Sequence, residues 1–268
     1  MPRLIVLLVV WAAMATAPPA VACGAKTDCT IGERSYRIAL PEGEGPYGAL
    51  VYMHGYRGTA AAVMENSGLR QMARDLGVAL IAPKSGGEDW LLRHAPRKGF
   101  TDDSRELAFF DAMLDDALAR HPIDPERLVA TGFSAGGMMT WTLACYRADR
   151  FAAFVPVAGT FWAPIPKTCN AAPVRLIHIH GTMDRVVPIE GRPIADTHQG
   201  DARAAMARFA AAGDYAGAAP LSSAPDDLAC TAREGRDVSR LVFCTHDGGH
   251  VLRPDWLSWA WNTLAEPS

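Results

Sequence analysis

The chain has 268 residues, of which 49% are hydrophobic and 21% charged, and its 26 basic and 29 acidic residues give a formal net charge of −3. This composition excludes a disordered chain, and the small net charge excludes a general attraction to nucleic acid or to an anionic membrane. A chain of this length can bury the core of one large α/β domain.

Residues 1–22 have the features of a secretory signal peptide. Arg3 precedes an apolar stretch over 4–15, and the small residues at 20–22 form a cleavage site before Cys23. The apolar stretch is too short for a membrane span. We therefore expect export to the periplasm or the medium, with residues 23–268 as a single catalytic domain. A lipid anchor at Cys23 is the second choice, because such signals carry Leu three residues earlier and this chain has Ala20.

Six cysteines follow the expected cleavage point. An even number of cysteines in an oxidising compartment favours disulfides over free thiols. Six cysteines allow fifteen pairings. Pairing by proximity in the sequence gives Cys23–Cys29, Cys145–Cys169 and Cys230–Cys244. A structural zinc site is the competing use, but the chain has no Cys-x-x-Cys pair, so we expect no metal.

The mature chain alternates strand-like and helix-like segments. Short apolar runs predict strands at 36–40, 49–53, 78–82, 128–131, 154–157, 174–180 and 241–245, the first of them at the edge of a sheet. Apolar residues at helical spacing predict helices at 103–120, 137–147, 201–212 and 256–264. This alternation is typical of an α/β fold with a mostly parallel sheet and helices on both faces. Residues 191–229 are the least regular, and we interpret them as an excursion within one domain.

The segment 131–137, Thr-Gly-Phe-Ser-Ala-Gly-Gly, lies directly between a predicted strand and a predicted helix. A Gly-x-Ser-x-Gly turn in this position holds its serine in an unusual backbone conformation and exposes it above the sheet. Gly132 and Gly136 are needed because side chains there would collide with the neighbouring strand and helix. The alternative is a plain glycine-rich turn, but the placement favours Ser134 as a nucleophile.

A nucleophilic serine needs a histidine base and a carboxylate that orients it, which in this arrangement follow in the order Ser, Asp or Glu, His. Asp184 lies just after the predicted strand 174–180, and no other acidic residue downstream of Ser134 closes a strand. His250 follows two glycines after the last predicted strand. His246 on the same loop is the alternative base, and we prefer His250.

Backbone N–H groups are expected to form the oxyanion hole. One belongs to the residue after the serine, Ala135, and a second comes from the loop after an early strand. The loop beginning His54-Gly55 follows the predicted strand 49–53 and suggests the N–H of Tyr56. We interpret His54 as a structural residue that hydrogen-bonds this loop.

Two histidine pairs have spacings that metal ligands use. His178 and His180 face the same side of a strand, and His246 and His250 lie four residues apart. Neither pair has an obvious third ligand, so we interpret them as support for the loops and expect no cofactor. Two tryptophans on loops after strands, Trp90 and Trp162, are candidates for the lining of a substrate pocket, with core packing as the alternative.

These motifs together resemble a known family. The segment 102–159 carries Ile-Asp-Pro-Glu-Arg, Thr-Gly-Phe-Ser-Ala-Gly-Gly-Met-Met-Thr, Leu-Ala-Cys-Tyr and Arg-Phe-Ala-Ala-Phe-Val-Pro-Val-Ala-Gly. With His54-Gly55, His180-Gly181-Thr182-Met183-Asp184 and Gly249-His250, the chain resembles secreted α/β-hydrolase esterases of the polyhydroxybutyrate depolymerase-like or feruloyl esterase-like group. The resemblance implies an α/β-hydrolase fold and hydrolysis of carboxylic esters through an acyl-enzyme on Ser134.

Three functions compete. The first is a serine esterase acting on small or oligomeric esters, either hydroxyalkanoates or feruloylated and acetylated sugars. The second is a serine peptidase of the prolyl-oligopeptidase type, which shares the Gly-x-Ser-x-Gly-Gly and Asp-x-x-Val-Pro patterns and usually adds a large extra domain. The third is a binding module without chemistry, which would have no use for a strained serine turn. We favour the esterase.

Overall fold

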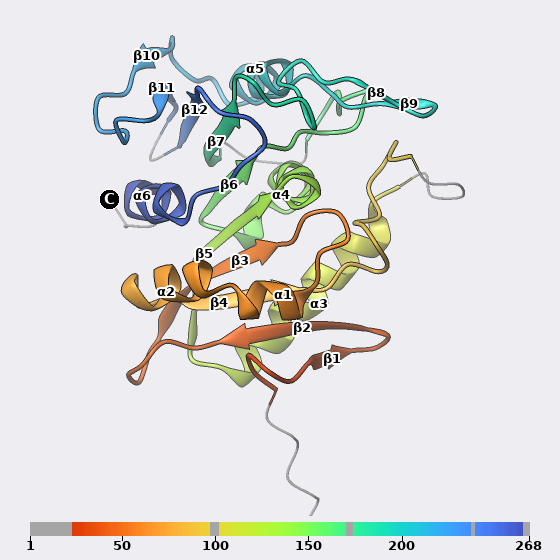
Figure 1. Cartoon of the computed structure of the whole chain (residues 1–268). Coiled ribbons are helices and arrows are strands. Elements are labelled where there is room, and N and C mark those ends of the chain that lie inside the picture. Colours follow the sequence, from red (N-terminus) through yellow and green to blue (C-terminus); the bar gives the residue numbers. More distant parts are fainter. Residues whose placement is uncertain (1–22, 97–101, 170–173, 237–238, 265–268) are drawn as a thin grey trace, which may run out of the picture.

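The computed structural model describes residues 23–96, 102–169, 174–236 and 239–264 (Figure 1). The predicted signal peptide, residues 1–22, lies outside these ranges. Among the helices of the described ranges, none combines the length and the apolar character needed to cross a membrane.

A sheet of ten strands runs through the molecule in the order β1-β2-β4-β3-β5-β6-β7-β12-β11-β10. Its six central strands, β4 to β12 in this order, pair in parallel, and the strands on either side are antiparallel. The bounds are β1 Cys29–Ile31, β2 Arg34–Ala39, β3 Tyr47–Met53, β4 Ala79–Pro83, β5 Ile123–Phe133, β6 Ala153–Val157, β7 Arg175–Gly181, β10 Ala219–Pro220, β11 Ala229–Glu234 and β12 Arg240–His246. A separate hairpin consists of β8 Pro193–Ile194 and β9 Thr197–His198.

Helices cover both faces of this sheet (Figure 1). Their bounds are α1 Ala60–Glu65, α2 Ser67–Asp75, α3 Ser104–Arg120, α4 Ala135–Tyr146, α5 Ala202–Ala212 and α6 Pro254–Leu264, with a short 3-10 turn at Ala148–Arg150. Successive residues of a strand point to opposite faces. In β3, Val51 and Met53 belong to the core under α3, α4 and α5, whereas Leu50 and Tyr52 belong to the core under α1, α2 and α6. The predicted α/β architecture is therefore confirmed.

All seven predicted strands and all four predicted helices are present, with shifted ends. One detail was wrong: β2 is not an edge strand, because β1 pairs with it from outside and places Cys29 opposite Tyr36. The helices α1 and α2 were missed because they are only 6 and 9 residues long. Their caps were the available signal, since Thr59 and Asn66 each accept a hydrogen bond from the first turn of a helix.

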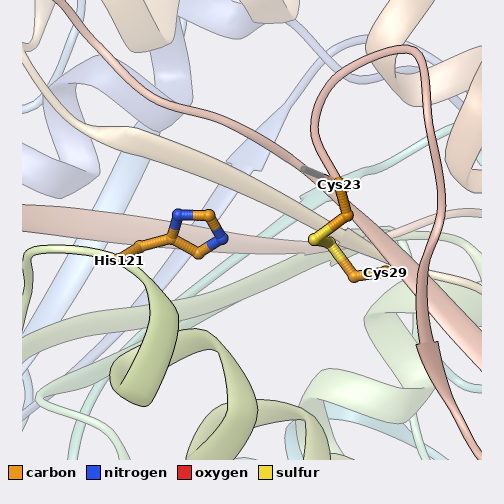
Figure 2. Close-up of side chains that lie close together, drawn as sticks. All are labelled: Cys23, Cys29 and His121. Carbon is orange, nitrogen blue, oxygen red and sulfur yellow. A yellow bond between two sulfur atoms is a disulfide. The ribbon is translucent and has the colours of Figure 1, made fainter. Parts of the chain in front are cut away.

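The three predicted disulfides are present and use all the cysteines of the chain. Figure 2 shows the first of them, Cys23–Cys29, with the ring of His121 beside its sulfur atoms. Cys23, Cys29 and His121 form the one group of three metal-ligand residues that lie close together in the described ranges. Metal ions bind the thiolate form of cysteine. Both sulfur atoms are in the disulfide, so this cluster offers no thiolate to a metal ion. The disulfide instead closes a short loop of the chain ahead of β2.

Candidate active site

Ser134 occupies the sharp turn between the end of β5 and the start of α4. Its backbone has φ 58° and ψ −119°, a conformation that L-residues rarely adopt and that costs of order 1–3 kcal/mol. Two backbone hydrogen bonds hold it there: the Ser134 N–H donates to the Val157 carbonyl at 3.0 Å, and its own carbonyl accepts from the Met138 N–H at 3.0 Å. The turn therefore has the strand-to-helix geometry that the sequence predicts.

The glycines around Ser134 allow β3, β5 and α4 to approach closely. A Cβ at Gly136 would lie 1.9 Å from the carbonyl oxygen of Met53 in β3, and one at Gly132 would lie 2.5 Å from the backbone of Gly136. Gly159 approaches the turn from the other side, since a Cβ there would lie 2.4 Å from the Ser134 carbonyl oxygen. These contacts are with backbone atoms, which cannot move away independently of the sheet.

We expect Gly136→Ala to destabilise the fold by about 3 kcal/mol or more, because the added methyl group overlaps the Met53 carbonyl oxygen. The measurement is the free energy of unfolding in urea. Gly217→Ala is the matched control, since a Cβ at Gly217 meets no atom within 4 Å and its change should stay within about 0.5 kcal/mol. Equal stability of the two variants would contradict the close approach at Gly136.

Asp184 and His250 meet across the ends of two adjacent parallel strands, β7 and β12. The Nδ1–H of His250 donates to Oδ2 of Asp184 at 2.6 Å. The loops that carry them are joined by backbone hydrogen bonds, from the Thr182 N–H to the His246 carbonyl at 2.9 Å and from the Met183 N–H to the Gly248 carbonyl at 3.0 Å. With Nδ1 occupied by Asp184, Nε2 of a neutral His250 is left with a lone pair.

Asp184 is held as an anion. Its side chain is fully buried, which by itself opposes ionisation, but the hydrogen bonds from His250 and from the backbone N–H groups of Val187 and Val186 outweigh that effect and lower its pKa. The two N–H groups donate to Oδ1 at 2.9 and 2.8 Å. Each oxygen of the carboxylate thus has a fixed partner: Oδ1 accepts from the backbone and Oδ2 from His250, while His180 Nε2 lies farther from Oδ2, at 3.5 Å.

The ring of His250 lies against the serine turn. It packs on the side chain of Phe133, the residue before Ser134, with ring centroids 4.5 Å apart. Its side chain is 15% exposed, so the imidazole is in contact with solvent on one side while its other side is packed. Three residues predicted from strand ends, Ser134, Asp184 and His250, therefore gather at the same edge of the sheet.

A cleft with a volume of about 590 Å³ opens beside Ser134. Tyr56 and Ala135, the predicted sources of oxyanion-hole N–H groups, both line it, and so does Trp162. The loop that bears Tyr56 is fixed by a hydrogen bond from the Arg57 N–H to the Glu88 carbonyl at 2.7 Å. The cleft walls also include residues that the sequence did not suggest: Glu88, Asp89, Pro96, Met138, Val186, Val187, Arg192, Ile194 and Gln199.

Trp90 is placed differently from the prediction that it lines the substrate pocket. Its side chain is fully buried, and its indole N–H donates to the His54 carbonyl at 2.9 Å. The ring packs against His54 and Phe110, with centroids 4.8 and 5.8 Å away. Trp90 thus supports the loop of Tyr56 from within the core, the alternative role that the sequence left open.

His54 hydrogen-bonds its loop, as predicted. Its Nε2 accepts from the Ser85 N–H at 3.2 Å, and its Nδ1 pairs with the Gly55 carbonyl at 2.9 Å. Burial lowers the pKa of the imidazole, despite an opposing effect of the hydrogen bond to Gly55. Both ring nitrogens are committed to the backbone, which leaves His54 no role as a base.

The two histidine pairs are tied to protein groups. His180 donates from Nε2 to the Val187 carbonyl at 2.6 Å, and its Nδ1 lies 2.9 Å from Nε2 of the fully buried His178. His246 accepts the Gly248 N–H on Nδ1 at 3.0 Å and packs on Trp256. Neither pair belongs to a group of three potential metal ligands within the described ranges.

We expect the free energy of unfolding to fall as the pH drops below about 6.5, the ordinary pKa of histidine. Burial lowers the pKa of each of five histidines, His54, His121, His178, His180 and His246. In this range the unfolded chain takes up protons that the folded chain does not, so acid favours unfolding.

The measurement is the free energy of unfolding in urea at about pH 7.5 and at about pH 5.5. Both values lie above the range in which most carboxyl groups titrate, so the difference reports mainly on the histidines. His178→Phe should make the pH dependence shallower, because it removes a buried titratable ring that packs between Trp141 and Phe243. A stability that is the same at both pH values would contradict the prediction.

Parts of the sequence are similar to known proteins. A model of the prolyl oligopeptidase family (peptidase S9) matches residues 87–163, which include Ser134. The putative esterase NocK of Nocardia uniformis subsp. tsuyamanensis is 34% identical over 165 residues, 59% of this chain and 47% of the relative. The probable feruloyl esterase C of Aspergillus niger is 27% identical over 171 residues, 60% of this chain and 58% of the relative. The chain thus spans about half the length of these relatives.

Solved structures share the fold over most of the chain. The acetyl xylan esterase from Aspergillus awamori superimposes with a TM-score of 0.58 at 17% identity, covering 85% of this chain and 94% of that one. Esterase PE8 gives 0.56 at 20% identity, with 85% and 96% covered. At these identities the likeness concerns the fold. The chain therefore has an α/β-hydrolase fold, and its sequence is similar to proteins named as esterases.

Proposed function

We propose that this protein is a serine carboxylesterase in which Ser134 is the nucleophile, His250 the general base and Asp184 the residue that orients it. The observation that carries the proposal is the 2.6 Å hydrogen bond between His250 Nδ1 and Asp184 Oδ2, at the same sheet edge as the strained Ser134 turn. A nucleophile, a base and an orienting carboxylate are the groups that acyl transfer through a covalent intermediate requires.

The reaction begins when His250 Nε2 takes the proton of the Ser134 hydroxyl as its oxygen attacks the ester carbonyl carbon. The carbonyl oxygen becomes an oxyanion, which accepts hydrogen bonds from the backbone N–H groups of Tyr56 and Ala135. His250 then returns the proton to the departing alcohol, which leaves an acyl-enzyme on Ser134. Water attacks the acyl-enzyme with His250 again as base, and the carboxylic acid leaves.

The substrate is proposed to be a small or oligomeric ester, either a feruloylated or acetylated sugar or a hydroxyalkanoate oligomer. The names of the relatives, feruloyl esterase C and acetyl xylan esterase, support the first class. The cleft supports the proposal of a substrate with a bulky acyl or alcohol group. Its volume of about 590 Å³ is within the usual range for small-molecule sites, and Tyr56 and Trp162 offer aromatic surfaces. The three disulfides support action outside the cytoplasm, as does the leader predicted over 1–22.

A serine peptidase is the second candidate, because the family model that matches residues 87–163 is that of prolyl oligopeptidases. The deciding experiment compares hydrolysis of short 4-nitrophenyl esters and methyl hydroxycinnamates with that of peptide 4-nitroanilides. The esterase proposal expects turnover of the esters at rates well above those of the anilides. Cleavage of the anilides with the esters left intact would establish the peptidase instead.

A further inference from the structure

Gln199 is a buried polar side chain in the wall of the cleft. The residue is 4% exposed and lines the same cleft as Ser134. Its Nε2 donates to the Val186 carbonyl at 3.3 Å, but its Oε1 has no hydrogen-bond partner among the residues that the structure describes. Buried acceptors in native proteins are nearly always paired, so an unpaired one beside a cleft calls for a ligand.

The position of Gln199 is fixed by its backbone. It forms an isolated antiparallel bridge with Trp162, and its N–H donates to the Arg192 carbonyl at 2.9 Å. Residues directly opposite in such a bridge place their side chains on the same side, about 5 Å apart at Cβ. Both side chains line the cleft. The side chains of Gln199 and Trp162 therefore leave this bridge on the same side, in the wall of the cleft.

We propose that Gln199 Oε1 accepts a hydrogen bond from a hydroxyl group of the bound ester and so selects hydroxylated esters. An ester group has two oxygen acceptors and no donor, so a plain alkyl ester cannot pair with this oxygen. A hydroxyl substituent supplies the missing donor while the carbon skeleton packs on Trp162. This inference rests on the proposed esterase function and adds the chemical feature that the cleft recognises.

The test compares esters that differ only in a hydroxyl group replaced by a methyl group of similar size. The acyl side is tested with 4-nitrophenyl 3-hydroxybutanoate against 4-nitrophenyl 3-methylbutanoate and with methyl 4-hydroxycinnamate against methyl 4-methylcinnamate. The alcohol side is tested with 2-hydroxyethyl butanoate against propyl butanoate. We expect the wild-type protein to prefer the hydroxyl member of at least one pair by about 10-fold in kcat/KM. The pair that shows the preference identifies the side of the ester that Gln199 contacts.

Two variants assign the preference to Oε1. Gln199→Met removes this oxygen and should reduce the kcat/KM ratio of the preferred pair to about 1. Arg192→Met is the matched control, because Arg192 Nε also donates to the Val186 carbonyl, at 2.9 Å, so its loss disturbs the same loop without removing the acceptor. In this control kcat/KM should fall by the same factor for both esters of the pair, so their ratio should not change.

Two results would overturn the inference. The first is a wild-type protein that prefers the hydroxyl member of no pair. The second is a folded Gln199→Met variant whose kcat/KM ratio for the preferred pair equals that of the wild-type protein. The wild-type comparison needs no variant, so it decides even where Gln199→Met fails to fold. Failure of the wild-type protein to cleave any of the six esters would instead refute the proposed esterase function. Cleavage of both members at equal rates refutes only the role of Gln199.

Discussion

Ser134→Ala should lower ester turnover by about 10⁴-fold or more. The variant keeps the Cβ that the turn already accommodates but loses the oxygen that forms the acyl-enzyme, so the remaining rate comes from binding and the oxyanion hole alone. The measurement is kcat on a 4-nitrophenyl ester, with the free energy of unfolding as a check that the fold is intact.

A covalent label separates this effect from a general loss of structure. A phosphonofluoridate that reacts with activated serines should add one adduct to the wild-type protein, at Ser134, and none to Ser134→Ala. Intact-mass measurement reads this result directly. An adduct on the folded variant, or turnover within a few fold of the wild-type rate, would place the nucleophile elsewhere.

His250→Ala should also lower kcat by about 10⁴-fold, whereas His246→Ala should cost less than about 10-fold. The two histidines are four residues apart on one loop, but only His250 is hydrogen-bonded to Asp184. His246 is committed to the Gly248 N–H and to the ring of Trp256, with centroids 4.6 Å apart, so its loss should appear mainly as reduced stability.

The two histidine variants control for each other, since each removes one imidazole from the same loop. The measurement is kcat for both, together with urea unfolding. A large loss of turnover in His246→Ala with a modest one in His250→Ala would reverse the assignment of the base.

The strands that the sequence predicts most clearly are those that are buried on both faces. The runs at 154–157 and 174–180 read as strands because β6 and β7 lie in the middle of the sheet. β1, the three residues Cys29–Ile31, has no such pattern and exists because β2 pairs with it. β11, Ala229–Glu234, begins at the end of the segment 191–229 that the sequence analysis interprets as irregular. It was not predicted, because only Cys230 and Ala232 of its six residues are buried.

The candidate site likewise has a part that the sequence predicts and a part that it does not. Ser134, Asp184 and His250 each follow a strand, and the carboxyl ends of parallel strands meet at one edge of a sheet, so their proximity could be predicted. The cleft wall could not, because Arg192, Ile194 and Gln199 reach it through the β8–β9 hairpin and a bridge to Trp162. Trp90 is buried and donates a hydrogen bond to the His54 carbonyl, a contact that no local sequence pattern predicts.

One peptide segment, residues 184–187, serves two roles at once. Asp184 accepts the N–H groups of Val186 and Val187, while the carbonyl of Val186 accepts from Arg192 and Gln199 in the cleft wall. Asp184, proposed to orient the base, and Gln199, proposed to select the ester, are therefore held by the same peptide segment. Specificity and catalytic rate should therefore change together, and laboratory evolution toward new esters should yield changes at 199 together with compensating changes within 184–187.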